Sequence, residues 1–238
     1  QMPDPSRKSV SASQMAALFD CSPYQTRFTL WHWMRGRDDG DDDSERMEWG
    51  RRLERAILDA TADRLNLIVR AGSGDSEWPC EMVNYRLGTY MRATDWPVGC
   101  TLDGTIWCPS RGRGVVQVKN VDWLIWRDGW TDKKAARHVE IQLQTEMAVT
   151  GAKWGVIACL VGGNQLRLYD RDPDEKVARL IIARSRDFMN SVAACDEPDP
   201  AAADEALVRE LYPVDMDAPT LDMTASAAAA DAVRRYAH

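Results

Sequence analysis

The chain contains no CxxC pair of cysteines and no apolar run long enough to cross a lipid bilayer. Tetrahedral zinc sites and iron–sulfur clusters need closely spaced thiolates, so neither is expected, and the six scattered cysteines are predicted to be reduced. A membrane-spanning helix needs roughly 18 apolar residues. Residues 1–13 are polar and lack the apolar core of a signal peptide. We therefore expect a cytoplasmic protein with no membrane partner.

An excess of basic residues is also missing. The 37 Asp and Glu residues outnumber the 30 Lys and Arg residues, which gives a formal net charge of −7. This charge weighs against DNA binding, because proteins that neutralise phosphates usually carry a basic footprint. However, much of the acid lies in residues 38–43 and from residue 196 onward, and the local field is what a nucleic acid meets. The net charge weakens a DNA-binding hypothesis without excluding it.

Hydrophobic periodicity and the breakers Gly and Pro predict the secondary structure. The first predicted helix is capped by Ser11 or Ser13, and the long third helix has an apolar stripe that includes Met47. Helices are expected over residues 11–21, 26–37, 45–65, 135–150 and 173–194, with shorter ones at 201–211 and 224–236. Strands are expected over residues 80–92, 98–107, 113–121, 154–161 and 165–169.

The order of these elements predicts the fold class. Helices come first, followed by a strand meander, and then a helix, a hairpin and a final long helix. This order indicates an α/β domain with a central mixed sheet flanked by helices. We expect the domain to cover residues 1–195 and an Ala/Asp-rich helical appendage to cover residues 196–238.

A candidate magnesium site lies on two segments that are predicted to pair as antiparallel strands. Asp103 is near the end of the first, and Gln117 and Lys119, two residues apart, share one face of the second. Mg²⁺ prefers oxygen ligands, which the Asp103 carboxylate, the Gln117 amide and the Val118 carbonyl offer. A lysine beside the metal can position a water or stabilise phosphate charge. An ordinary hairpin with a Q-x-K surface pattern remains the alternative.

Two helical residues strengthen this hypothesis. Glu54 lies on the long helix before the strands, and Gln142 lies on the helix after them. Each also has an ordinary interpretation. Glu54 is surrounded by arginines and fits a solvated ion pair, and Gln142 fits a polar helix position.

The order of these motifs resembles a known family. The order comprises a helix with a WGxxxE motif whose last residue is Glu54, the strand with Asp103-Gly104, a strand with a Q-x-K motif and a helix with a QxQ motif. Residues 11–24, 150–154 and 169–172 resemble further blocks of the same family. Over residues 7–195 the chain is similar to the lambda-type alkaline exonucleases (YqaJ-like viral recombinases) of the PD-(D/E)XK nuclease superfamily. The resemblance implies a restriction-endonuclease-like core.

The resemblance also implies roles for individual residues. Asp103, the Val118 carbonyl and Glu54 would hold Mg²⁺ or Mn²⁺, together with Gln117, which stands where the family usually has a glutamate. Lys119 would be the catalytic lysine, and Gln142 would lie near the nucleophile. A pocket for the 5′-phosphate of a DNA end would be formed by Ser13, Ser11, Arg7 and Thr101.

A basic and aromatic segment follows the second strand. Its tryptophans could stack on bases, although such residues more often fill a core. The segment is predicted to be a DNA-facing loop, with the basic residues Arg127, Lys133, Lys134 and Arg137.

The resemblance implies a 5′→3′ exonuclease that acts on double-stranded DNA ends in phage-type recombination, in the cytoplasm of a host. It further implies a ring-shaped homotrimer and a single-strand annealing protein as partner. Three alternatives stay open: another RecB-like nuclease, a DNA-end-binding protein weakened by Gln117, and an α/β domain without nuclease activity.

Overall fold

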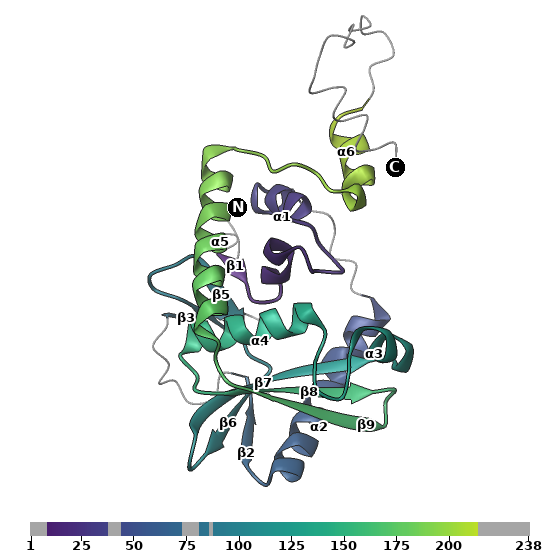
Figure 1. The fold of residues 1–238 in the computed structure, drawn as a ribbon, viewed down its shortest axis with the longest axis vertical. Helices are drawn as coiled ribbons and strands as arrows, with labels where there is room; N and C mark the ends of the chain where they lie inside the picture. Colours follow the sequence, from purple (N-terminus) through teal and green to yellow (C-terminus); the bar gives the residue numbers. More distant parts are fainter. Residues whose placement is uncertain (1–8, 38–43, 73–80, 86–87, 214–238) are drawn as a thin grey trace, which may run out of the picture. The chain divides into compact units, whose positions relative to one another are not determined.

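The first of two structural units, residues 1–204, is built on a mixed five-stranded sheet between helices (Figure 1). The computed structural model describes residues 9–37, 44–72, 81–85 and 88–213. None of the helices in these ranges is long and apolar enough to cross a membrane. The second unit, residues 205–238, contributes the described helix α6 (Glu205–Leu211). The expected helix at 224–236 falls outside the described residues.

The main sheet has the strand order β2-β6-β7-β8-β9. Only β7 and β8 pair in parallel, and the other neighbours are antiparallel, so the predicted mixed α/β sheet is confirmed. A parallel pair needs a long crossover, which here contains α3 (Trp123–Gly129) and α4 (Arg137–Thr150). The strands are β2 (Ile68–Ala71), β6 (Gly104–Cys108), β7 (Gly112–Val121), β8 (Gly155–Val161) and β9 (Gln165–Arg171).

Helices cover both faces of this sheet. Strand side chains alternate between faces, so Val115 and Ile157 belong to the core on the α4 side, whereas Val116 and Val156 belong to the core on the α2 side. Figure 1 shows α4 on one side of β7 and β8 and α2 on the other. The remaining helices of the unit are η2 (Met15–Phe19), α1 (Arg27–Met34), α2 (Glu45–Leu65), α5 (Glu175–Ala194) and η3 (Ala202–Asp204).

A second sheet, which the sequence did not predict, has the order β1-β5-β4-β3. The segment expected as one strand over 98–107 breaks at Asp103, so its halves join different sheets. At the break, the Asp103 carboxylate accepts the backbone N–H of Val118 at 2.7 Å. The strands of this sheet are β1 (Val10–Ser11), β3 (Glu81–Tyr85), β4 (Gly88–Arg92) and β5 (Val98–Thr101).

Four further local predictions were wrong. The segment expected as one strand over 80–92 forms the two antiparallel strands β3 and β4. The amino-terminal segment forms a short strand and a 3₁₀ helix whose N-cap position is Gln14, not Ser11 or Ser13. Ser11 pairs with strand β5, and its Oγ accepts the Gln14 N–H at 3.3 Å in the turn before the helix. The expected loop after β7 begins with helix α3, which Asp122 caps by accepting from the Leu124 N–H at 2.8 Å. Met47, assigned to the apolar stripe of α2, is half exposed.

The described cysteines are free thiols, as expected, and Cys80 lies outside the described residues. Burial raises the pKa of Cys159 to about 12, so this thiol stays protonated and acts as an apolar core residue.

Gly114 lies at a close approach between strand β7 and Trp154. A Cβ atom there would lie 2.8 Å from two ring atoms of Trp154, whose indole is buried and donates to the Gly112 carbonyl at 3.2 Å. We expect Gly114→Ala to lower the free energy of unfolding by about 1–3 kcal/mol. Gly50→Ala, in helix α2 with nothing within 4 Å of the new Cβ, should raise it by about 0.5–1 kcal/mol. Urea unfolding of both variants measures the difference, and equal midpoints would contradict this packing.

Candidate active site

Asp103 lies between strands β5 and β6 and faces strand β7. Its Oδ2 accepts the backbone N–H of Val118 at 2.7 Å and an N–H of the Gln117 side-chain amide. Burial raises the pKa of the Asp103 carboxyl, although the Lys119 ammonium and the hydrogen bonds from Val118 and Gln117 partly oppose the shift. The structure therefore brings together the pair of segments that the sequence proposed as a metal site.

Gln142 on helix α4 forms hydrogen bonds with both Gln117 and Lys119 of β7. Its Oε1 accepts from Lys119 Nζ at 3.0 Å, and its Nε2 donates to Gln117 Oε1 at 2.7 Å. This arrangement confirms that Gln117 and Lys119 project from one face of the strand. A continuous chain of hydrogen bonds runs from Lys119 through Gln142 and Gln117 to Asp103.

Glu146, one turn after Gln142 on α4, is a member of the cluster that sequence reasoning missed. Its side chain is fully buried, and its Oε1 accepts a second N–H of Gln142 Nε2 at 3.1 Å. Burial, with the nearby charge of Asp103, raises the pKa of Glu146 well above its ordinary value. One sequence signal was present: Glu146 stands on the helix face that carries Leu143 and Met147, both buried.

Glu54 on helix α2 approaches the same cluster from the other face of the sheet. Burial raises the pKa of Glu54, the charge of Asp103 adds to the shift, and Lys119 opposes it. Among its neighbours, Arg52 pairs with Glu48 and Arg55 with Asp59. Glu54 is partly buried and the charges of Asp103 and Lys119 both affect its pKa, so it does not lie on a purely solvated helix face.

The chemistry of these donors fits a hard divalent cation, because carboxylate, amide and carbonyl oxygens are what Mg²⁺ prefers. In the described part of the chain, Oε2 of the buried Glu146 has no hydrogen-bond partner, a condition that a cation can satisfy. Two features of this arrangement oppose the binding of a cation. No three His, Cys, Asp or Glu side chains in the described ranges cluster closely enough to hold a metal. In addition, Gln117 turns its Nε2 toward both Asp103 and the Val118 carbonyl, the latter at 3.3 Å.

The predicted 5′-phosphate residues gather at one end of the second sheet. Strands β1 and β5 are parallel, with Ser11 opposite Gly99, so Ser13, just after β1, and Thr101, the last residue of β5, belong to the same end of the two strands. Ser11 Oγ and Ser13 Oγ are 2.9 Å apart, and Ser13 is exposed. Thr101 is also exposed and precedes Asp103 by two residues. The fourth predicted residue, Arg7, lies outside the described residues.

An open groove of about 620 Å³ contains three of the four predicted DNA-binding residues. Arg171 on β9 also lines it and is held by Glu140 through two hydrogen bonds, at 2.6 and 2.9 Å. Arg171 further donates to the carbonyl of Lys133 at 3.0 Å, which anchors the loop before α4. The basic residues of the groove are Lys133, Lys134, Arg137 and Arg171.

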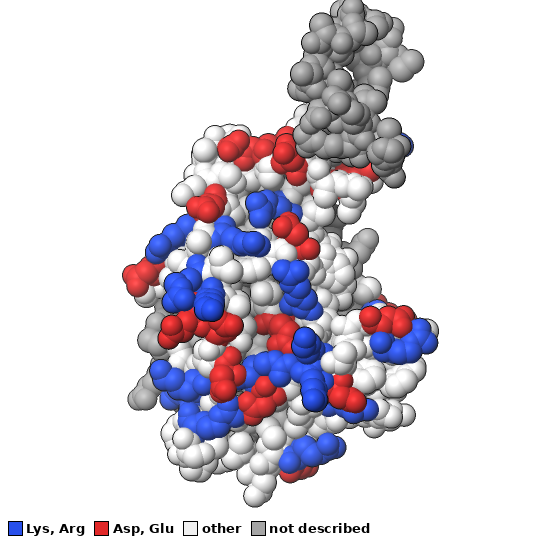
Figure 2. Space-filling model, viewed as in Figure 1, with Lys and Arg blue, Asp and Glu red and all other residues white. Residues whose placement is uncertain are grey.

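The fourth predicted residue, Arg127, does not line this groove. It lies on α3 and donates to Asp128 at 2.7 Å. Trp126 and Trp130 are buried in the core, and Trp123 is 47% exposed and stacks on Trp126. Figure 2 shows one face of the molecule, on which Lys and Arg side chains are mixed with Asp and Glu. This face therefore carries interspersed charges of both signs and not a continuous basic surface.

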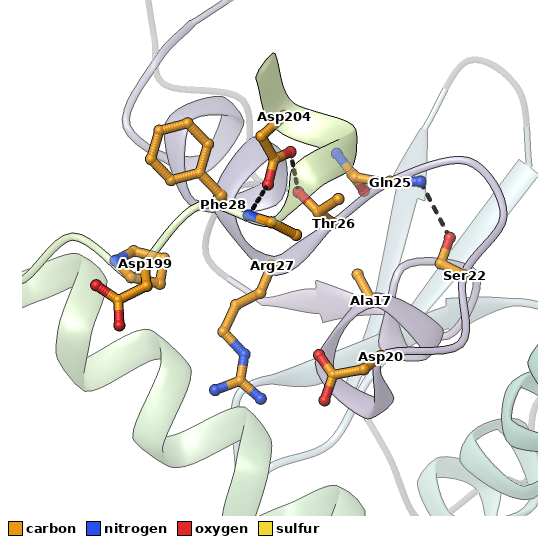
Figure 3. Close-up of a pocket in the computed structure, with 11 residues that line it drawn as sticks. Ala17, Asp20, Ser22, Gln25, Thr26, Arg27, Phe28, Asp199 and Asp204 are labelled. Atoms are coloured by element: carbon orange, nitrogen blue, oxygen red, sulfur yellow. Dashed lines mark hydrogen bonds between the residues drawn. The ribbon is translucent and has the colours of Figure 1, made fainter. Parts of the chain in front are cut away.

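A separate pocket of about 490 Å³ lies beside α1 and contains none of the predicted site residues (Figure 3). Asp204 in its wall is buried and accepts from Thr26 Oγ1 at 2.6 Å and from the Ala201 N–H at 2.7 Å. These bonds hold the segment after α5 against the start of α1.

Solved structures of LHK-Exo, an alkaline exonuclease from Laribacter hongkongensis, are similar to this chain. The protein alone matches with a TM-score of 0.56 and 16% identity, over 86% of this chain and 93% of that one. Its complex with dAMP matches with a TM-score of 0.55 and 17% identity, over 87% and 95%. At these identities the likeness concerns the fold, which is of the PD-(D/E)XK kind.

A search of curated proteins finds no match. A family model described as the YqaJ-like viral recombinase domain matches residues 5–153, which is more than half of the chain. The segment includes α2, Asp103, Gln117, Lys119 and Gln142. This chain therefore belongs to the YqaJ-like viral recombinase family.

Proposed function

We propose that the protein is a metal-dependent exonuclease that digests double-stranded DNA from the 5′ end and leaves 3′ single strands for annealing. The observation that carries this proposal is the hydrogen-bonded cluster of Asp103, Gln117, Gln142 and Lys119 between β7 and α4. Membership of the viral recombinase family supports it.

The cluster provides the groups that phosphodiester hydrolysis requires. Asp103, the Val118 carbonyl and Glu54 would hold Mg²⁺ or Mn²⁺, and Gln117 could join them once its amide oxygen turns inward. The bound ion would supply Lewis-acid activation of the phosphate and of the attacking water. Lys119, whose ammonium is oriented by Gln142, would donate to a phosphate oxygen on which negative charge develops.

Two surfaces would position the DNA. Ser11, Ser13 and Thr101 offer hydroxyl groups for a terminal 5′-phosphate close to Asp103, and the groove before α4 offers ammonium and guanidinium groups for the backbone. We also propose a homotrimeric ring whose basic groups line the inner channel, since this would reconcile a net charge of −7 with DNA binding. A single-strand annealing protein would receive the 3′ strand.

Removal of the lysine should abolish turnover but not DNA-end binding. We expect Lys119→Ala to lower the rate of duplex shortening by about 10²–10⁴-fold, the usual contribution of one positioned catalytic group. DNA affinity should change little, because the groove and the serines remain. Gel assays on linear duplex measure both quantities, with the exposed Lys176→Ala on α5 as control. Unchanged turnover in Lys119→Ala would contradict the catalytic role of this lysine, and no turnover in the wild-type protein would favour a domain without nuclease activity.

The polarity of digestion can be tested with defined DNA ends in Mg²⁺. A duplex with a 5′-phosphate should be shortened faster than the same duplex with a 5′-hydroxyl, because the charged phosphate offers several strong acceptor oxygens to the serine hydroxyls, whereas the hydroxyl offers one neutral oxygen. Ser13→Ala should reduce this preference. Equal rates on both ends in the wild-type protein would contradict the proposed phosphate site.

One observation favours a weakened enzyme that mainly binds DNA ends: Gln117 directs an N–H group, not an oxygen, at Asp103. Gln117→Glu replaces this donor with a carboxylate, so cleavage at limiting Mg²⁺ should increase. Without metal the variant should be less stable, because two carboxylates then face each other. Cleavage rates and thermal unfolding across a Mg²⁺ titration measure both effects, and unchanged or lower metal-dependent cleavage would contradict this interpretation.

A further inference from the structure

We infer that Glu146 supplies the second buried carboxylate of the cation site, in place of the carboxylate that Gln117 lacks. This inference rests on the proposed metal-dependent function and assigns to α4 a role that the usual glutamate on β7 would have. Two observations carry it: the burial of Glu146 with an unpartnered carboxylate oxygen, and the hydrogen-bond donor that it shares with Gln117.

The burial of Glu146 is difficult to explain by packing alone. Its side chain has no exposed surface, yet only Oε1 has a hydrogen bond, and Oε2 has no partner within the described ranges. A buried ionisable group is costly unless it is paired or coordinates a metal. The two other buried polar groups of α4 differ in this respect, because Thr145 and Thr150 each donate to a helix carbonyl at 2.7 Å.

Glu146 and Gln117 are held by the same nitrogen atom. Nε2 of Gln142 donates to Gln117 Oε1 at 2.7 Å and to Glu146 Oε1 at 3.1 Å. The Glu146 carboxylate is therefore two hydrogen bonds from the position on β7 that the family usually fills with a glutamate. Its charge also interacts with Asp103 and Lys119, which places it in the same electrostatic cluster.

A neutral amide at position 117 is compatible with a carboxylate on α4, because a second carboxylate on β7 would place a further negative charge beside Asp103.

Manganese binding by the full chain without DNA tests this inference, with free Mn²⁺ measured by electron paramagnetic resonance. Glu146→Gln should weaken Mn²⁺ binding by about tenfold or more, because a like-sized neutral side chain removes one charge near the ion. Asp204→Asn, which neutralises a buried carboxylate beside α1, should bind Mn²⁺ like the wild type. The charge-swapped double variant Gln117→Glu/Glu146→Gln should recover wild-type affinity.

Unchanged Mn²⁺ affinity in Glu146→Gln would overturn the inference, as would a wild-type protein that binds no Mn²⁺ when Gln117→Glu does. If Glu146→Gln alone does not fold, the double variant decides: an affinity equal to that of Gln117→Glu shows that Glu146 contributes nothing. The proposed function fails separately, when wild-type protein that binds Mn²⁺ does not shorten linear duplex in Mg²⁺.

Discussion

The side chain of Gln142 ties helix α4 to strand β7, and the geometry of the whole candidate site depends on it. Its carbonyl oxygen orients the Lys119 ammonium, and its amide nitrogen holds Gln117 and Glu146. A glutamine can do this because it accepts at one end and donates twice at the other. The crossover between β7 and β8 places α4 over β7, and so brings Gln142 to these partners.

Asp103 has a comparable role at the junction of the two sheets. Its carboxylate accepts the Val118 N–H at the break between β5, which joins the second sheet, and β6, which joins the main one. Asp103 therefore follows the end of β5 that pairs with β1, which carries Ser11 and leads to Ser13. The residue that would hold the ion thus follows directly on one of the strands that would receive a DNA end.

Electrostatics explains why such a cluster is suited to function rather than stability. Burial raises the pKa of Asp103 and of Glu146, the charge of Asp103 raises the pKa of Glu146 further, and the Lys119 ammonium opposes both shifts. The burial of these carboxylates costs less free energy when a cation is bound, so the free energy of folding and the affinity for metal are linked. Strongly perturbed carboxyl groups that share a cluster are typical of functional sites.

Local signals in the sequence determined several elements without help from the rest of the chain. Helix α2 has the predicted bounds because Ser44 caps its start and Asn66 adopts a left-handed conformation at its end. Strand β8 follows from its apolar run and the glycines after it, and the shared face of Gln117 and Lys119 follows from the two-residue period of a strand. The motif order also identified Asp103, Glu54 and Gln142 as candidates, because it is carried by residue types and spacing.

Tertiary structure alone decided the features that depend on long-range pairing. The second sheet requires β1 and β5, 88 positions apart at the Val10–Val98 pair, and no local pattern records such a contact. For the same reason Ser11 could be taken for a helix cap, and Met47 for a core residue. The sequence around Glu146 is that of an ordinary glutamate in a helix. Only the packing of α4 against β7 buries it beside Asp103, because burial is a property of what covers a residue and not of its neighbours in the chain.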